Sequence, residues 1–265
     1  MTRLPLYQVD AFADEVFQGN PAAVCPLPEW LPDETLQAIA AENNLSETAF
    51  LVPGEDPVPL RWFTPRQEVP LCGHATLAAA FVVLTYLEPE RDSVTFESRS
   101  GPLRVFRDDD GFALDFPALR AEGMDAVPDA LPEGLGVDFV DVRVTHEDPN
   151  YLAILESQDV VADLQPDLWT LETLHPYGVA VSAPGTATDF VSRYFAPGYG
   201  IPEDPVTGSI HCALAPYWAE RLGRERLSAR QASERGGRLD LVVAGERVHI
   251  EGTAVTYMTG EIVVP

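Results

Sequence analysis

The sequence predicts an α+β fold with two pseudo-symmetric lobes, each a mostly antiparallel, barrel-like sheet wrapped around one central helix. Three observations predict it. Short β-type runs fill both halves of the 265-residue chain. Two helical segments are apolar nearly all round, which is typical of helices enclosed by protein. The stretches that lead into these two helices match each other, which indicates an internal duplication.

The predicted strands are short, and turn residues such as Asp110-Gly111 and Gly236-Gly237 separate several of them. Residues that are β-branched or aromatic favour such strands. In the first half the runs are LPLYQVDAF, ETAFLV, LRWFT, SVTFES, LRVFR and FALDF. In the second half they are FVDVRVT, YLAILE, YGVAVSA, TDFVSRYF, RLDLVVAG and RVHIEG.

Helical patterns are fewer than strand patterns. Residues 32–43 begin with Pro32 and Asp33, which favour the start of a helix. A second helical pattern, over 159–174, is broken by Pro166. Residues 125–136 are rich in Pro and Gly, so we interpret them as a connection between domains.

The two enclosed helices follow Gly73 and Gly208, with the sequences HATLAAAFVVLTYL and SIHCALAPYWAERL. Pro216 should kink or locally open the second of them. Residues 61–65, RWFTP, reappear as RYFAP, and EVPLCGH reappears as EDPVTGS. In each half an aromatic strand leads through a proline turn to a glycine and then to an enclosed helix, which is the pattern of a duplicated lobe.

The chain is strongly acidic, with 42 acidic residues against 17 basic ones and a net charge of −25. It contains no lysine, which excludes Schiff-base chemistry, including pyridoxal phosphate linked through lysine. DNA would be repelled, so we expect no nucleic-acid partner. Two interpretations of the acidity stay open, adaptation to high salt and a generally soluble surface.

Several features predict a cytoplasmic protein without a membrane partner. No apolar run approaches the ~18 residues needed to span a bilayer, and the N-terminus lacks the pattern of a signal peptide. Cys25, Cys72 and Cys212 are odd in number and widely spaced, which fits a reducing compartment. The apolar content of 46% should support a core without disulfides or metals.

Each repeat places a helix start directly after a glycine, Gly73 or Gly208. Free N–H groups and the helix dipole make such a start favourable for an anion. If a twofold axis relates the lobes, both starts face one cleft, which suits a small carboxylate-bearing substrate. The simpler interpretation is that the glycines only permit tight turns.

His74 and Ser209 occupy equivalent positions just inside these helices and could bind a ligand from opposite sides. A helix start disfavours the imidazolium, so we expect a neutral His74 that donates or accepts a proton. Asp204 could orient a substrate amine or hydroxyl. The simpler roles are a helix cap for Ser209 and a turn-forming residue for Asp204.

Cys72 directly precedes Gly73, and the helix could stabilise its thiolate for acid–base work. The equivalent residue is Thr207, which is no general base at neutral pH without help, so we do not predict two opposed thiols. His211 and Cys212 are adjacent on a helix and point about 100° apart, which suits one metal ion poorly. We therefore predict no metal site.

Glu47 lies in the stretch NNLSETAF. In a strand, alternation places it on the same face as Leu45, Ala49 and Leu51. An isolated glutamate there would extend to water at the strand edge. Beside a cleft it would point inward, and its apolar neighbours would favour the protonated acid, which suits a proton carrier.

Long stretches of the chain closely resemble the PhzF family of phenazine biosynthesis-like proteins, within the diaminopimelate epimerase fold superfamily. They are VDAFADEVFQGNPAAV, NNLSETAFL, RWFTPRQEVPLCGHATLAAA, DFVSRYFAPGYGIPEDPVTGSIHCALAPYW and QASERGG. The resemblance covers essentially the whole chain and implies two pseudo-symmetric lobes with the active site in the cleft between them. We expect an N-terminal lobe of 1–118, completed by the strand 253–265, and a C-terminal lobe of 119–252.

The resemblance also implies chemistry. The phenazine enzyme is a cofactor-free isomerase of dihydro-3-hydroxyanthranilate that moves a proton with one glutamate, and Glu47 matches that position. His74, Asp204 and Ser209 match the other active-site residues. Diaminopimelate epimerases use two opposed cysteines, whereas Thr207 stands opposite Cys72 here. The family often forms dimers, so a homodimer is expected.

Our hypothesis is a cofactor-independent isomerase that moves a proton on a small carboxylate-bearing metabolite. Glu47 would carry the proton, and the other groups would bind or assist: His74, Asp204 and Ser209 in catalysis, and Gly73, Gly208, Cys72 and Thr207 in substrate binding. Two alternatives stay open. One is a racemase or epimerase that uses Cys72, and the other is a non-catalytic protein that binds small acids on the same fold.

Overall fold

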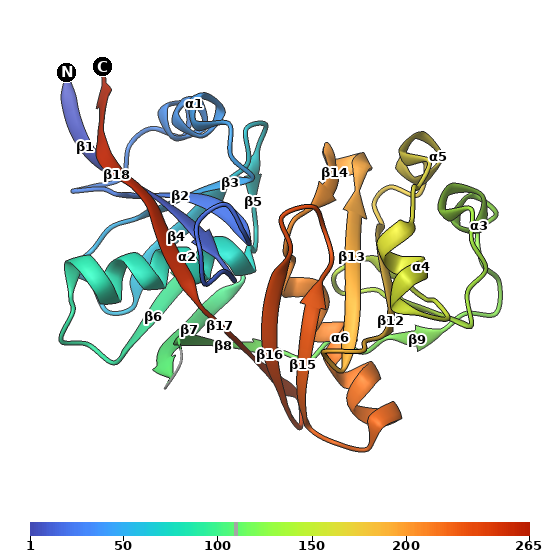
Figure 1. Ribbon diagram of the computed structural model, residues 1–265. Helices are drawn as coiled ribbons and strands as arrows, with labels where there is room; N and C mark the ends of the chain where they lie inside the picture. Colours follow the sequence, from blue (N-terminus) through green and yellow to red (C-terminus); the bar gives the residue numbers. More distant parts are fainter. Residues whose placement is uncertain (109–110) are drawn as a thin grey trace. The chain divides into compact units, whose positions relative to one another are not determined.

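The computed structural model describes residues 1–108 and 111–265 (Figure 1). The chain divides into two compact units. Unit 1 comprises Met1–Asp115 and Glu251–Pro265, and unit 2 comprises Phe116–Ile250. The turn predicted at Asp110-Gly111 includes Asp110, which lies outside the described residues. Within these residues, no helix has the length and apolar character needed to cross a membrane.

In its described part, unit 1 is mainly strands with two helices. Its strands are β1 (Thr2–Ala11), β2 (Asn20–Pro26), β3 (Glu47–Leu51), β4 (Val58–Phe63), β5 (Glu68–Val69), β6 (Ser93–Ser98), β7 (Gly101–Asp108) and β18 (Ala254–Val264). Its helices are α1 (Asp33–Asn43) and α2 (Gly73–Val82), and α2 continues into the π-helical turn η1 (Val83–Leu87). Two strands, β8 (Gly111–Pro117) and β17 (Arg247–Gly252), each include residues of both units.

Unit 2 also consists mainly of strands, but it has more helical segments than unit 1. Its strands are β9 (Glu122–Gly123), β10 (Asp141–Thr145), β11 (Asn150–Ile154), β12 (Gly178–Pro184), β13 (Phe190–Ala196), β14 (Ile201–Asp204), β15 (Arg226–Gln231) and β16 (Gly237–Ala244). Its helices are α3 (Ala130–Leu135), α4 (Gln158–Asp163), α5 (Leu168–Glu172), α6 (Gly208–Leu222) and the 3₁₀ turn η2 (Pro197–Tyr199). The predicted break at Pro166 is confirmed, since it separates α4 from α5.

The strand pairing confirms the internal duplication. In unit 1, β2 pairs antiparallel with β1 and parallel with β3, and the antiparallel pairs β3–β4 and β4–β5 lead into α2. In unit 2, β11 pairs antiparallel with β10 and parallel with β12, and the antiparallel pairs β12–β13 and β13–β14 lead into α6. The same order of strand directions therefore delivers each central helix.

The registers also identify equivalent residues in the two units. Arg61 on β4 faces Phe50 on β3, and the matching Arg193 on β13 faces Val181 on β12. Counting back three positions from Phe50 and Val181 makes Glu47 equivalent to Gly178. A Cβ atom at Gly178 would overlap the hydroxyl of Tyr194. Unit 2 therefore has no room for a glutamate at the position of Glu47.

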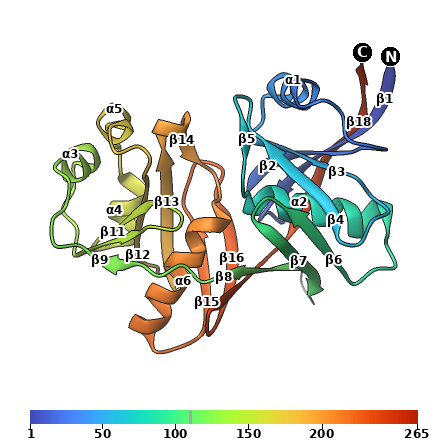
Figure 2. The same ribbon diagram turned by 180° about the vertical axis from the view of Figure 1, so that it is seen from behind.

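The central helices are enclosed as their apolar sequences predict (Figures 1 and 2). Every residue of α2 except Phe81 is buried, and α6 is largely buried as far as Trp218. The helix α6 runs through Pro216 without ending. Because proline has no N–H, the carbonyl of Cys212 is left without its helical donor, and it accepts the N–H of Leu119 instead.

The sequence misplaced the connection between domains. Residues 125–136 include α3, and Leu131 and Leu135 lie in the core of unit 2. Short helices rich in Pro and Gly resemble linkers in composition, and burial of their few leucines distinguishes them only in the folded chain. In unit 1, a separate core forms where α1 packs on the sheet through Leu36, Ile39 and Ala40.

Candidate active site

Glu47 is the first residue of β3, and its side chain is buried with 7% of the residue exposed. All of β3 is buried. The strand lies between β2 and β4, and the helices α1 and α2 both contact it. Strands covered on both faces lose the alternation of polar and apolar residues. The carboxylate is therefore held inside unit 1, and the interpretation of a strand-edge glutamate that reaches water is wrong.

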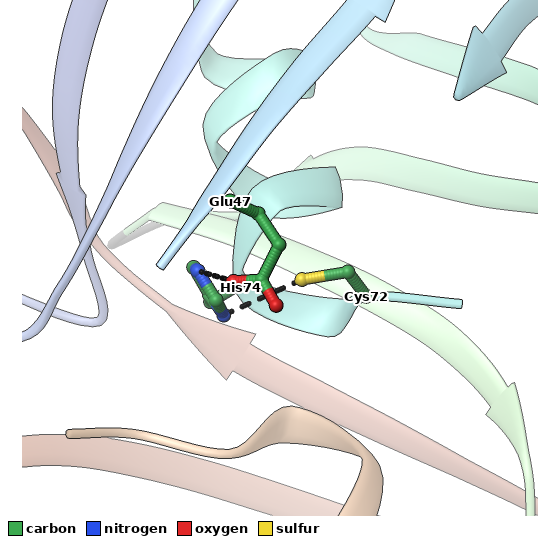
Figure 3. Close-up of side chains that lie close together, drawn as sticks. All are labelled: Glu47, Cys72 and His74. Atoms are coloured by element: carbon green, nitrogen blue, oxygen red, sulfur yellow. Dashed lines mark hydrogen bonds and ion pairs between the residues drawn. The ribbon is translucent and has the colours of Figure 1, made fainter. Parts of the chain in front are cut away.

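Cys72 and His74 come from the start of α2 and lie beside Glu47 (Figure 3). Nε2 of His74 lies 3.1 Å from Oε2 of Glu47, and Sγ of Cys72 lies 3.5 Å from Nδ1 of His74. Cys72 and His74 are 7% and 3% exposed. The tertiary structure thus brings a carboxylate, an imidazole and a thiol together from two elements of unit 1.

The contact between Glu47 and His74 has the distance of an ion pair but lacks the alignment of a hydrogen bond. Among the described residues, neither Oε2 of Glu47 nor Nε2 of His74 has an aligned hydrogen-bond partner. Buried polar atoms are nearly always satisfied, and exceptions concentrate at functional sites. The two atoms therefore keep hydrogen-bonding capacity for a group that binds there.

Burial and charge set the protonation of these groups. Burial, followed by the Glu47 charge, raises the pKa of Cys72 to about 11, so the thiol is protonated at neutral pH. Burial lowers the pKa of His74, but negative charge on Cys72 and Glu47 raises it, and the result lies well above the usual value. Because Cys72 is uncharged at neutral pH, we assign the upward direction to the Glu47 carboxylate.

Two expectations about protonation are therefore wrong. The sequence suggested a Cys72 thiolate stabilised by the helix, but burial outweighs the helix dipole and keeps the thiol protonated. It also suggested a neutral His74, but a carboxylate at 3.1 Å favours the imidazolium more than the helix start disfavours it. Both errors arise because the sequence does not show which side chains become neighbours.

Asn20 is a member of this cluster that the sequence analysis did not single out. It is the first residue of β2, is fully buried, and donates from Nδ2 to Nδ1 of His74 at 3.1 Å. The stretch FQGNPAAV marks the position only as a turn before a strand. Its contact with His74 depends on the parallel pairing of β2 with β3, which no local pattern reveals.

The other predicted site residues lie in unit 2, at the start of α6. Asp204 ends β14 and accepts a hydrogen bond from the Thr207 hydroxyl at 2.5 Å. Gln231 on β15 accepts the N–H of Thr207 at 2.8 Å and donates to the carbonyl of Asp204 at 2.7 Å. Gln231 is fully buried, and these two hydrogen bonds fix the turn before the helix. The sequence did not single out this residue.

The starts of α2 and α6 match in detail. Cys72 and Thr207 are the residues before each helix, and both have extended backbones. Neither Thr207 nor Cys72 forms a side-chain capping hydrogen bond with its helix, and helix starts without such a cap favour another acceptor for their N–H groups. Ser209 is the second residue of α6, so its interpretation as the helix cap is wrong.

The predicted residues thus form one group in each unit: Glu47, Cys72, Gly73 and His74 in unit 1, and Asp204, Thr207, Gly208 and Ser209 in unit 2. That both groups line one cleft stays a prediction.

The donors of Glu47, Cys72 and His74 lie within 4.8 Å of one another, and zinc accepts such a set. However, Cys72 approaches Nδ1 of the ring and Glu47 approaches Nε2. One ion cannot use both contacts, because each nitrogen directs its lone pair to a different side of the ring. The contacts therefore fit proton exchange between side chains better than metal binding.

Comparison with known proteins gives concordant results. The family model described as phenazine biosynthesis-like protein, PhzC-PhzF, matches residues 9–260. An uncharacterized isomerase of Pseudomonas aeruginosa is 54% identical over 98% of both chains. The human phenazine biosynthesis-like domain-containing protein is 38% identical over 98% of this chain and 99% of its own.

Solved structures agree with these sequence matches. A PhzF family protein of Enterococcus faecalis has a TM-score of 0.94 and 45% identity, with 99% of this chain and 100% of that chain covered. A hydroxyproline epimerase of Agrobacterium vitis shares the fold alone, with a TM-score of 0.62 and 12% identity over 98% and 92% of the chains. The fold class and the family that the sequence predicts are confirmed. The chain belongs to the PhzC-PhzF family of phenazine biosynthesis-like proteins.

Proposed function

We propose that this protein is a cofactor-independent isomerase that moves a proton within a small carboxylate-bearing metabolite, with Glu47 as the proton carrier. The observation that carries the proposal is the buried contact of 3.1 Å between Glu47 and His74. Isomerase activity agrees with the names of relatives that are 54% and 48% identical, both uncharacterized isomerases of Pseudomonas aeruginosa.

The cluster suits transfer of a proton between two positions of one substrate. A carboxylate removes the proton, and the same group, now an acid, returns it elsewhere. His74 stabilises the carboxylate by charge and offers a proton of its own. Because the equivalent of Glu47 in unit 2 is Gly178, a second glutamate at the matching position is absent among the described residues. This favours one carrier over a pair of opposed bases.

Substrate binding is assigned to the two helix starts. The uncapped N–H groups at Gly73 and Gly208 favour an anion. Asp204 and Ser209 would place the substrate's amine or hydroxyl, with Cys72 and Thr207 beside it. We propose that the two groups line one cleft and that the protein works as a homodimer in the cytoplasm. Light scattering on the purified protein tests the dimer.

The experiment begins with a thermal-stabilisation screen of aromatic and amino-acid carboxylates. Each hit is then incubated with enzyme in D₂O, and deuterium incorporation is followed by NMR. Glu47→Gln keeps the shape of the side chain and should still bind the hit, while the rate of exchange falls at least ~100-fold. Glu97→Gln, an exposed position on β6, is the matched control and should exchange at the wild-type rate.

Exchange by Glu47→Gln at the wild-type rate would refute the assignment. Binding of hits without any exchange by the wild type would instead favour a non-catalytic protein that binds small acids.

The alternative of a racemase or epimerase has one observation in its favour, the contact of Cys72 with His74 at 3.5 Å. In that reaction Cys72 would exchange the proton at a stereocentre. Cys72→Ser would then abolish deuterium incorporation, whereas the isomerase reaction through Glu47 would keep its exchange and change only in substrate affinity. The equivalent residue Thr207 has a hydroxyl in place of a second thiol, and this hydroxyl donates to Asp204.

A further inference from the structure

Asn20 contacts Nδ1 of the His74 ring, and Glu47 lies next to the other ring nitrogen, Nε2. Its Nδ2 atom lies 3.1 Å from Nδ1 of His74, while Nε2 of the same ring lies 3.1 Å from Glu47. Asn20 and His74 are 0% and 3% exposed. The ring is thus fixed between an amide on one side and a carboxylate on the other.

The amide defines which ring nitrogen carries a hydrogen. An amide NH₂ only donates, so this contact belongs to the neutral ring, in which Nδ1 of His74 accepts. In the imidazolium, which nearby negative charge favours, Nδ1 carries a hydrogen and only donates. The Cys72 thiol, 3.5 Å from Nδ1, also has a hydrogen to donate. With Nδ1 accepting, the single hydrogen of the neutral ring is on Nε2, the nitrogen next to Glu47.

We propose that Asn20 is a positioning residue that decides which nitrogen of the neutral His74 ring carries the hydrogen and keeps it on Nε2, the nitrogen 3.1 Å from Glu47. The proposal deepens the proposed function and rests on it, because Glu47 and His74 are the groups that move the proton there. Asn20 acts through His74 and is not itself assigned to touch the substrate.

An amide suits this position better than a carboxylate. When His74 takes up a second proton, only Nδ1 is left to receive it, and the Asn20 amide must then present Oδ1. Asparagine therefore serves both charge states of the ring. An aspartate would accept only, which would hold a hydrogen on Nδ1 and favour the charged form of the ring.

The duplicated unit supports a specific role for the amide. The registers Ala22–Glu47 and Asn150–Gly178 make Asn20 equivalent to Asp148. The equivalent of His74 in that unit is Ser209, which has no ring whose tautomer must be set. The amide is thus found in the unit with the histidine, and a carboxylate is found in the unit without it.

The charged groups around α2 leave this assignment intact. Glu47 on β3 and Cys72 before α2 act directly on His74. Of the other strands that contact α2, β1 contributes Asp10, whose carboxylate accepts the N–H of Phe17. The strand β18 contributes Glu261, which pairs with Arg3 at the surface.

The test is ¹⁵N NMR of the imidazole rings during a pH titration of the full chain, and it needs no substrate. The chain has five histidines, and loss of one signal set in His74→Gln assigns His74. In the wild type, the neutral ring should carry its hydrogen on Nε2. A neutral ring with hydrogen on Nδ1 would overturn the proposal without any other variant.

Asn20→Asp should raise the pKa of His74 by about one unit or more, because it adds a negative acceptor at hydrogen-bond distance. The control is Asn43→Asp, the same atomic change in unit 1 at a residue bonded to Thr48, and it should leave His74 unchanged. A His74 titration that is the same in Asn20→Asp and in the wild type would also overturn the proposal.

The outcome is separable from the proposed function. If Glu47→Gln retains full deuterium exchange, the proposed function fails while the NMR result still stands. If Glu47→Gln is inactive but His74 shows the wrong tautomer, only the role of Asn20 fails. With a substrate identified by the screen, Asn20→Asp should also move the pH profile of exchange to higher pH, which a merely structural defect would not do.

Discussion

Oε2 of Glu47 lies 3.1 Å from Nε2 of His74, with both side chains buried in unit 1 (Figure 3). A carboxylate and an imidazole at this distance act as one unit for holding a proton. Glu47 belongs to a strand and His74 to a helix start, so the contact exists only through the packing of α2 against β3.

The Glu47–His74 pair should show strongly non-additive kinetics. Glu47→Gln and His74→Gln each remove one half of the pair, and each should lower deuterium exchange by ~100-fold or more. The double variant should be about as slow as the slower single variant, because residues that act as a unit are lost together. Exchange rates of the four proteins measure this, and multiplicative losses would contradict a shared role.

The three cysteines should react with iodoacetamide in a defined order as the pH rises. Burial raises the pKa of Cys72 to about 11 and those of Cys25 and Cys212 to about 12. Only thiolates react, so all three should stay unlabelled in the folded protein at pH 7.5, and Cys72 should label first at higher pH. Peptide mass spectrometry gives the order.

Glu47→Gln should make Cys72 more reactive, because the Glu47 charge contributes to its raised pKa. Unchanged Cys72 labelling in that variant would show that the thiol does not sense this carboxylate. Full labelling of the wild type at pH 7.5 would contradict the raised pKa of the thiols.

His211 should make the protein less stable in mild acid. Burial lowers its pKa to about 4, against 6.5 for an exposed histidine. Between these values the unfolded chain binds the proton and the folded chain does not, so stability is complete above pH 6.5 and falls towards pH 4. The loss should amount to about 3 kcal/mol at pH 4.

Urea unfolding at several pH values measures this effect of His211. The variant His211→Gln should have a flatter dependence over the same window, whatever its stability at neutral pH. An equal pH dependence in both proteins would remove His211 as its source.

Arg193 should be important for stability. Its guanidinium forms a two-point contact with Glu203, with distances of 2.7 and 2.9 Å, and also donates to the carbonyl of Leu164. Arg193→Met removes these contacts from the partly buried Glu203 and from the carbonyl of Leu164, and it should cost about 2–3 kcal/mol in urea unfolding.

Arg3→Met is the control for Arg193, because Arg3 pairs with Glu261 while its side chain is 71% exposed. It should cost less than about 1 kcal/mol. Similar losses in the two variants would argue against a special role for the partly buried Arg193–Glu203 pair.

The Arg193–Glu203 contact repeats in unit 1 as Arg61–Glu68, with distances of 2.7 and 2.8 Å. In both units it joins the long strand to the short one that leads into the central helix. The repeated sequences RWFTP and RYFAP therefore have a physical basis that only the folded structure shows. Each supplies the arginine of the ion pair and the turn before the short strand that leads into a central helix.

The sequence by itself determined the elements and their duplication. Apolar helices, alternating strands and glycines at helix starts depend on neighbours in the chain. The helices expected over 32–43 and after Gly73 and Gly208 are therefore present, and each begins within one residue of the expected start. The broken helix at Pro166 and the equivalence of Cys72 with Thr207 follow from the same local rules. The family resemblance followed from these motifs too.

Only the tertiary structure decided the protonation and the partners within the site. The pairing of β2 with β3 brings Asn20 to His74, and the packing of α2 brings His74 to Glu47. Burial then keeps Cys72 protonated, against the expectation from its helix start. Charge and desolvation depend on distances between residues far apart in the chain, which is the reason that no local pattern could set them.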